Sequence, residues 1–194
     1  MGVAEERKQR GCMSMPQNID WLGRWKRRPF FVFRKRSVYL ETLSIRQAVP
    51  SDLKKIVELD TKVWEDVSVP DGSHVWRLWI DHAIVVVAEW EKEIVGAALA
   101  FPSASAKEEN LYLLHKIFVR KDRRGELIGF QLLSGIKNEL VSRLGGASGS
   151  FLLTVKPGNE VAKRLYGFMG FEEVSTVLNY YGPGKDRTFM KLSF

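Results

Sequence analysis

Residues 119–133, VRKDRRGELIGFQLL, join an apolar strand-like run to a helix-like one and carry groups that could bind an anion. A strand that leads directly into a helix leaves free backbone N–H groups, which bind anions together with the helix dipole. Gly125 and Gly129 let a phosphate approach the backbone, and Arg123 and Arg124 add positive charge. The patterns G-x-x-x-x-G-K-[ST] and G-x-G-x-x-G are absent. We interpret the segment as a pyrophosphate cradle; the alternative is an ordinary basic helix start.

A second spaced set lies about 30 residues further on, in NEVAKRLYGFMGF, and comprises Asn159, Ala162, Leu165, Tyr166, Gly170 and Phe171. With these two segments the chain resembles the GCN5-related N-acetyltransferase (GNAT) superfamily. Members carry a strand ending in Val, then R-G-x-G-x-G, and later N-x-x-A-x-x-L-Y-x-x-x-G-F. The second pattern is complete here, and the first is present as Val119 and RGELIG, residues 124–129. The runs IVGAALAF and LHKIFV also match the family's third and fourth strands.

One position departs from the family's loop, because Leu127 replaces its middle glycine and Glu126 adds a negative charge. We expect the backbone donors to serve if Leu127 keeps ordinary helical dihedral angles and points away from the ligand. Glu126 in the first turn also favours the helix dipole. The departure supports an alternative function, that of a non-catalytic module that binds acyl-coenzyme A.

The resemblance implies acetyl-coenzyme A as cosubstrate, with no metal. It also implies that strands four and five splay apart and that the pantetheine arm pairs with the fourth strand like an added strand. Asn159 could hydrogen-bond the arm, or it could simply cap its helix. The implied cofactor-binding residues are Ile117, Phe118, Val119, Arg124, Gly125, Glu126, Leu127, Ile128, Gly129, Asn159 and Tyr166.

Acyl transfer from a thioester to an amine needs a base for the ammonium and an acid for the leaving thiolate. The resemblance gives Tyr166 the acid role; the alternative is core packing. His115 is our expected base or water relay, since its ordinary pKa suits neutral pH, and strand alternation would place it on one face with Ile117 and Val119. The alternative is a core histidine. Glu108 and Glu109 are reserve candidates, and His74 and His82 are weaker ones.

The acceptor pocket is expected from the first two helices and the last strand pair. These segments offer acids and aromatics that suit a cationic amine, namely Trp64, Glu65, Asp66, Asp71, Trp76, Trp79, Tyr180 and Tyr181. The same aromatics could be core residues. A peptide amino terminus, a lysine, a polyamine and a small arylamine all remain open as acceptors.

The net charge of +7 is confined to residues 1–40, which hold ten Lys and Arg against three acids. Residues 41–194 are neutral, with twenty of each. We therefore divide the chain into a basic, aromatic extension, 1–40, and one acetyltransferase-like domain, 41–194. The extension is either a plain surface segment or a site for nucleic acid or an anionic membrane. One cysteine excludes an internal disulfide, and no leader or membrane-spanning run is seen, so we expect a cytoplasmic protein. A homodimer is left open.

Apolar periodicity and turn residues predict alternating strands and helices. Strands are expected at 43–49, 83–90, 93–101, 111–119, 151–155, 171–181 and 187–194. Helices are expected at 50–64 with Ser51 as N-cap, at 71–82 starting with Asp71 or Ser73, at 125–144 and at 157–169 with Gly170 as C-cap. The fold class is α/β (α+β), with a mixed central sheet of about seven strands and flanking helices.

Overall fold

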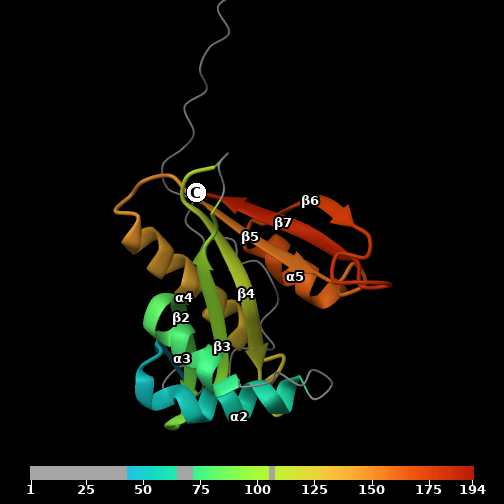
Figure 1. Cartoon of the computed structure of the whole chain (residues 1–194). Coiled ribbons are helices and arrows are strands. Elements are labelled where there is room, and N and C mark those ends of the chain that lie inside the picture. Colours follow the sequence, from blue (N-terminus) through green and yellow to red (C-terminus); the bar gives the residue numbers. More distant parts are fainter. Residues whose placement is uncertain (1–42, 65–71, 105–107) are drawn as a thin grey trace, which may run out of the picture. The chain divides into compact units, whose positions relative to one another are not determined.

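The computed structural model describes residues 43–64, 72–104 and 108–194. It contains a seven-stranded sheet with helices on both faces (Figure 1). The strands are β1 (Leu43–Gln47), β2 (Ile84–Trp90), β3 (Glu93–Pro102), β4 (Leu111–Val119), β5 (Ser150–Val155), β6 (Glu172–Val177) and β7 (Arg187–Ser193). The helices are α2 (Leu53–Val63), α3 (Gly72–His82), α4 (Ile128–Arg143) and α5 (Glu160–Phe168), with 3-10 turns η2 (Pro50–Asp52) and η3 (Lys121–Arg123). The predicted extension, 1–40, lies outside the described residues.

The strand order is β1-β2-β3-β4-β5-β7-β6, and every neighbouring pair is antiparallel except β4 with β5. Figure 1 shows that β5 diverges from β4 as the two strands run toward their carboxyl ends, and that β7 and β6 lie beyond β5. The predicted mixed sheet, with splayed fourth and fifth strands, is therefore confirmed.

Two apolar layers cover the sheet. On one face α4 buries Ile128, Leu132, Leu133, Ile136 and Leu140 against side chains from the central strands, and Tyr166 of α5 joins them. On the other face Ile56 and Leu59 of α2 and Trp76 of α3 pack against β2, β3 and Phe118. The helical spacing of these apolar residues is the reason that each helix has a single buried face.

Two glycines let α4 approach the sheet closely. A Cβ on Gly96 in β3 would lie 2.9 Å from the carbonyl oxygen of Phe118 and 3.0 Å from Leu132 Cδ1. A Cβ on Gly135 of α4 would lie 2.7 Å from Ile45 Cγ2. All three distances are shorter than normal van der Waals contacts, so the helix–sheet spacing depends on the absence of side chains at these glycines.

Local signals located most element ends. The β2–β3 turn uses Glu91 and Lys92, both with positive φ, as a two-residue hairpin requires. Gly170 follows α5 with φ +94°, and the N–H of Phe171 donates to the carbonyl of Tyr166 at 3.0 Å, as in a glycine C-cap.

Two predicted helix starts are wrong. Ser51 does not cap the first helix; instead the Asp52 carboxylate accepts the N–H of Val49 at 2.9 Å, and η2 precedes α2. The long helix begins at Ile128 rather than Gly125, because Gly125 and Leu127 both have positive φ. Helix α3 begins at Gly72, and Asp71 lies outside the described residues.

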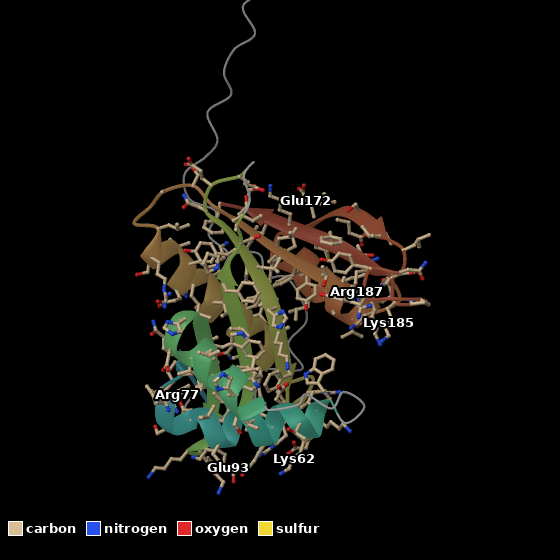
Figure 2. All side chains as sticks on the ribbon, in the orientation of Figure 1. Lys62, Arg77, Glu93, Glu172, Lys185 and Arg187 are labelled. Atoms are coloured by element: carbon tan, nitrogen blue, oxygen red, sulfur yellow. The ribbon has the colours of Figure 1, made fainter. Side chains whose placement is uncertain are left out.

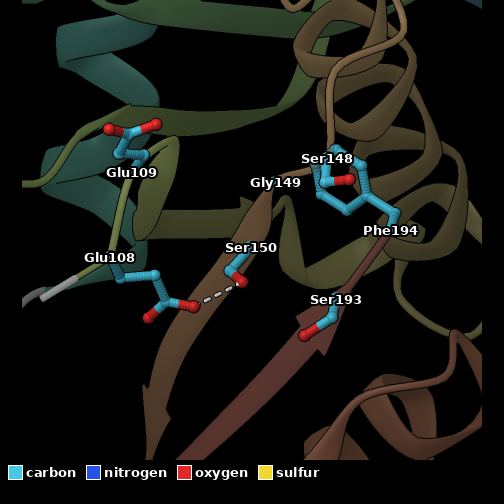
Figure 3. Close-up of a pocket in the computed structure, with 7 residues that line it drawn as sticks. All are labelled: Glu108, Glu109, Ser148, Gly149, Ser150, Ser193 and Phe194. Carbon is cyan, nitrogen blue, oxygen red and sulfur yellow. Dashed lines mark hydrogen bonds between the residues drawn. The ribbon is translucent and has the colours of Figure 1, made fainter.

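The amino ends of β4 and β5 are tied to the end of β7. The carboxylate of Glu108 accepts the Ser150 hydroxyl at 2.7 Å and pairs with the Lys191 ammonium. A hollow of about 470 Å³ lies beside it (Figure 3), lined by Glu108, Glu109, Ser148, Gly149, Ser150, Ser193 and Phe194. This end of the sheet is opposite to the end where β4 and β5 separate.

Strand β6 is the exposed edge of the sheet. All six of its residues are exposed, and it pairs with β7 alone. Figure 2 places Lys185 and Arg187 at the turn end of the β6–β7 hairpin. The Arg187 guanidinium lies 4.8 Å from the ring of Tyr181. None of the helices within the described ranges is long and apolar enough to cross a membrane.

Candidate active site

The opening between β4 and β5 is the central feature of the site. The two strands pair over only four positions, which end at Leu114 with Leu153. Beyond that point Ile117, Phe118 and Val119 pair only with β3, on the other side of the strand. Their backbone groups on the β5 side therefore have no strand partner among the described residues, as a ligand that pairs like an added strand would require.

The predicted phosphate cradle lies where β4 ends. After η3, Gly125 has φ +84°, Leu127 has φ +62°, and α4 then begins at Ile128. Within the described part of the chain, the N–H groups of residues 125–130 donate to no acceptor, whereas the N–H of Gln131 donates to the carbonyl of Leu127. Six consecutive donors are thus available at the start of a 16-residue helix.

Leu127 does not have the ordinary helical dihedral angles that we expected. It occupies the left-handed region with φ +62° and ψ +10° as the N-cap residue of α4, and its side chain is exposed. The loop must turn through this conformation to aim its donors, and the family's pattern has a glycine here. A leucine in this conformation costs roughly 1–2 kcal/mol relative to a right-handed one.

The arginines of the loop have partners within the chain. Arg124 Nε donates to the carbonyl of Val119 at 3.2 Å, which joins the loop to the end of β4. The Arg123 guanidinium lies over the ring of Trp90, 4.6 Å from its centroid, and 3.8 Å from a Glu126 oxygen. That Glu126 oxygen is buried and accepts no hydrogen bond within the described residues. The side chain of Glu126 is therefore directed at Arg123.

Asn159 caps α5, as one of its two predicted alternatives required. Its Oδ1 accepts the N–H of Ala162 at 3.2 Å. The residue is exposed, and its amide nitrogen makes no hydrogen bond with the described part of the chain. Capping therefore uses the Oδ1 atom of the side-chain amide, and the Nδ2 group remains available to donate to a ligand.

Tyr166 projects from α5 into the apolar layer shared with α4. It is 7% exposed, and its ring contacts that of Phe171 with centroids 5.9 Å apart. Burial raises the pKa of its phenol to about 12, because the phenolate would lose its hydration. At neutral pH the hydroxyl is therefore fully protonated, as a proton donor must be. Both predicted roles, acid and core residue, are compatible with this placement.

His115 lies in a β-bulge of β4. Leu99 of β3 pairs with Lys116 and Ala100 pairs with Leu114, so His115 is the extra residue between them. The predicted common face with Ile117 and Val119 is wrong, because the bulge interrupts the alternation. Those two residues pack on the α4 side.

On the opposite face, which α2 and α3 cover, the His115 ring contacts Trp79 and Phe101 with centroids 5.3 and 5.4 Å away. One side of the imidazole is exposed, and these rings remove water from the other side. Desolvation therefore lowers the pKa of His115, the nearby Lys116 lowers it further, and Asp60 raises it. The imidazole is neutral at pH 7 and can accept a proton.

Two of the tryptophans expected to receive a cationic acceptor already lie beside a cation of the chain. Lys116 Nζ lies 5.7 Å from the Trp76 ring and 5.6 Å from the Trp79 ring. It also donates to Asp60 Oδ2 at 2.7 Å, and Trp76 Nε1 donates to the same oxygen at 2.8 Å. Trp76 is 1% exposed. It is therefore a core residue and not a pocket wall.

Other expected acceptor residues are dispersed. Glu65, Asp66 and Asp71 lie outside the described residues. Trp64 is exposed at the end of α2. Tyr180 and Tyr181 are exposed on the β6–β7 turn and contact each other, with ring centroids 4.7 Å apart. Their neighbours Lys185 and Arg187 are basic.

The reserve bases Glu108 and Glu109 lie at the other end of β4, beside the hollow described above. Glu108 lies at the closed end of the β4–β5 pair, where Lys191 and Ser150 lower its pKa and keep it charged. His74 and His82 are exposed on α3. No cluster of three or more potential metal ligands occurs in ranges 43–64, 72–104 and 108–194.

Sequence reasoning missed Asp60 and Lys116. Asp60 is 6% exposed on a helix position that follows Leu59 and lies four residues after Ile56. An acid on the buried face of an amphipathic helix was the available signal, because buried carboxylates need a partner.

Comparison with known proteins agrees with this architecture. The model of the acetyltransferase (GNAT) family matches residues 52–171. A comparison with curated protein sequences found no match.

Several solved structures share the fold. One is the ribosomal-protein-alanine N-acetyltransferase of Brucella melitensis, with 25% identity, a TM-score of 0.67, and coverage of 78% of this chain and 99% of that one. Another is Naa50 of Arabidopsis thaliana in complex with the bisubstrate analogue CoA-Ac-MVNAL, with 22% identity, a TM-score of 0.65, and coverage of 79% and 99%. A third is yncA of Salmonella typhimurium with acetyl-CoA, with 19% identity, a TM-score of 0.66, and coverage of 78% and 93%. Since the family model matches more than half of the chain, the protein belongs to the GNAT family of acetyltransferases.

Proposed function

We propose that the protein is a cytoplasmic N-acetyltransferase that transfers the acetyl group of acetyl-CoA directly to a primary amine. One observation carries the proposal: the β4–β5 ladder ends at Leu114, and the strand edge beyond it leads to a loop with unpaired N–H groups. A ligand with an extended amide arm and a diphosphate at one end fits both features.

The residues present fit acetyl-CoA. Backbone groups of Ile117 and Val119 would pair with the amides of the arm, and the donors of residues 125–130 would hold the diphosphate. Gly129 leaves room at the helix start, since a Cβ there would only touch Leu165 at 3.6 Å. Asn159 would offer its free amide nitrogen. Acetyl-CoA supplies an activated acyl group on a thiolate leaving group; the chain supplies orientation and proton transfer.

Tyr166 serves as the proposed acid. A phenol with a pKa of about 12 stays protonated throughout the neutral range and can donate to the departing sulfur. Its position in α5, in the layer that α4 and α5 share, supports this role, because the same layer contacts Ile117 and Val119.

His115 serves as the proposed base or water relay. It directly follows Leu114, the last residue of β4 that pairs with β5, and its side chain faces the layer formed by α2 and α3. An amine approaching the strand edge from that face would meet a neutral imidazole. Acid and base would therefore act from opposite faces of the sheet, and the opening between β4 and β5 gives both access to one strand edge.

A peptide amine is the acceptor class that the comparisons favour. The Arabidopsis neighbour was solved with an analogue that joins CoA to a peptide, and the Brucella neighbour is named for a protein substrate. Lys116 Nζ already lies beside the Trp76 and Trp79 rings, so recognition of a cationic amine by these rings is not part of the proposal.

The test has two stages. Calorimetry with acetyl-CoA measures binding, and thiol release over a panel of peptides, lysine, polyamines and arylamines measures transfer. Mass spectrometry of the product then locates the acetyl group. Absence of binding contradicts the proposed site. Binding without transfer to any amine favours the alternative of an acyl-CoA-binding regulatory module, which the strained Leu127 supports.

A third function would reside in residues 1–40, whose basic and aromatic residues suit nucleic acid or an anionic membrane. Deleting them should then abolish binding to RNA or to anionic vesicles and leave acetyl transfer intact. Transfer that is lost with the deletion would instead connect the extension to the enzyme.

A further inference from the structure

A buried ion pair lies beneath the bulge of β4. Lys116 and Asp60 are 56 positions apart in sequence and meet at 2.7 Å, with side chains 17% and 8% exposed. Trp76 Nε1 donates to the same Asp60 oxygen at 2.8 Å. The other carboxylate oxygen is buried and has no hydrogen-bond partner within the described residues. The pair is thus held from β4, α2 and α3 together.

His115 and Lys116 are neighbours in the bulge, and their side chains extend to the same face. His115 contacts the Trp79 ring at 5.3 Å, and Lys116 Nζ lies 5.6 Å from that ring. The Trp79 ring therefore lies close to both the imidazole and the ammonium. Lys116 and Asp60 are the charged groups of the described chain that act electrostatically on the imidazole, and they act with opposite sign.

We propose that the Asp60–Lys116 pair is a positioning device for His115, which fixes the bulge and balances two opposite charges beside the imidazole. The proposal rests on the proposed function, since His115 needs positioning only if it handles the proton of the acceptor amine. Neither Asp60 nor Lys116 is assigned contact with either substrate, so both act through His115.

Stability alone is a weak explanation for this pair. Burying two charges costs desolvation energy, and apolar side chains of similar size often pack at least as favourably. The aromatic surroundings of Trp76 and Trp79 could accept such side chains. The ion pair lies at the bulge between β3 and β4 instead, where it fixes His115 as the residue of β4 that has no partner in β3.

The ionic arrangement predicts opposite effects of two single substitutions. Lys116→Met removes the positive charge and leaves Asp60, so the imidazolium becomes more favourable and the pKa of His115 rises. Asp60→Asn removes the negative charge that raises the pKa of His115 and leaves Lys116, which lowers it, so the pKa of His115 falls. The double variant removes both charges and should fall between them.

The pKa of His115 can be measured without any assay of transfer. Proton–carbon NMR follows the three imidazoles of the chain, His74, His82 and His115, and His115→Gln identifies the relevant signal. Opposite shifts in Lys116→Met and Asp60→Asn support the proposal. Shifts in the same direction, or none, overturn it. If Lys116→Met does not fold, Asp60→Asn alone decides, because a raised or unchanged pKa is then the contrary result.

Kinetics separate this proposal from the proposed function. The acid limb of kcat/KM should move in the direction of the NMR shift, and kcat should fall roughly ten- to a hundred-fold in each single variant, since the base is displaced. Lys116→Arg, which keeps the charge, should retain the wild-type pH profile. An inactive wild-type protein would contradict the proposed function, whereas an active wild-type protein with unmoved profiles would contradict only the role of the pair.

Discussion

Leu114 and Leu153 are the last residues that pair β4 with β5, and His115 follows Leu114 in the bulge directly beyond that pair. The pairing of β4 with β5 thus ends at the same place where the pairing of β4 with β3 is interrupted by a bulge. A strand edge becomes free there while an imidazole turns toward α2 and α3. This coincidence is the geometric basis for placing the reacting groups at the middle of β4.

Tyr166→Phe should lower kcat roughly a hundred-fold and leave the Kd for acetyl-CoA unchanged, because only the proton donor is lost. Steady-state kinetics and calorimetry measure the two quantities. Tyr112→Phe, on the paired part of β4, is the matched control and should retain kcat. Unchanged turnover in Tyr166→Phe would remove the acid role and leave Tyr166 as a core residue.

Gly129→Asp should abolish acetyl-CoA binding without unfolding the protein. A carboxylate in the first turn of α4 favours the helix dipole, yet it places a negative charge where the diphosphate is expected. Gly129→Ala adds only a methyl group, whose nearest contact would be Leu165 at 3.6 Å, and should bind nearly as well as wild type. Calorimetry distinguishes the variants, and equal affinities would mean that the cradle lies elsewhere.

Leu127→Gly should stabilise the protein by about 1 kcal/mol, because glycine adopts the observed φ of +62° without the clash of a Cβ. Urea unfolding measures the change. Leu127→Ala removes the same exposed side chain but keeps the strain, so it should show no gain. If both variants unfold alike, the strain inferred at this residue is absent.

Activity should decline in acid, at a pH below the ordinary pKa of histidine. The pKa of His115 is lowered, chiefly by desolvation, so the neutral base predominates above that lowered pKa and is lost by protonation below it. His115 also opposes folding in acid, because the unfolded chain binds the proton more readily than the folded one, so its contribution to stability is lost as the pH falls.

The alkaline side gives a second check on the same profile. The pKa of Tyr166 is about 12, so its ionisation should not limit kcat near pH 9. In His115→Gln the acid limb of kcat/KM should disappear. An acid limb that persists in this variant would assign the base to another group.

Gly96→Ala should destabilise the fold by about 1–3 kcal/mol, the usual cost of overpacking. Its Cβ would lie 2.9 Å from a backbone oxygen, which cannot move aside as a side chain can. Gly158→Ala is the control, since no atom lies within 4 Å of its Cβ position. Equal midpoints of urea unfolding for the two variants would show that α4 shifts without cost.

The sequence predicted those features that depend on neighbouring residues. Alternation and turn residues located the strands, and a glycine after an amphipathic segment located the end of α5. The segment at 119–129 was identified because a strand, two glycines and basic residues follow each other directly. The mixed sheet followed from the order of the predicted strands and helices, whereas the family and the splayed strands followed from the resemblance of two motifs.

Features that depend on strand register could not be predicted. A bulge at His115 requires knowing which residues of β3 face β4, and no local pattern records that. The Asp60–Lys116 pair joins segments 56 residues apart, so the position of Asp60 on the apolar face of its helix indicates a partner but not that the partner is Lys116. Leu127 was expected to be helical because the predicted helix began at Gly125, but the loop turns through a left-handed conformation at Leu127 before α4 begins.

Four residue pairs are all that connect the two halves of the sheet through β4 and β5. The half formed by β5, β7 and β6 is therefore held by these four pairs, by the contacts of Glu108 with Ser150 and Lys191, and by the apolar layer under α4. A cosubstrate bound between β4 and β5 would add contacts that join the two halves of the sheet. Its binding should thus raise the melting temperature and slow proteolysis across both halves, so that the enzyme is most robust when it is loaded.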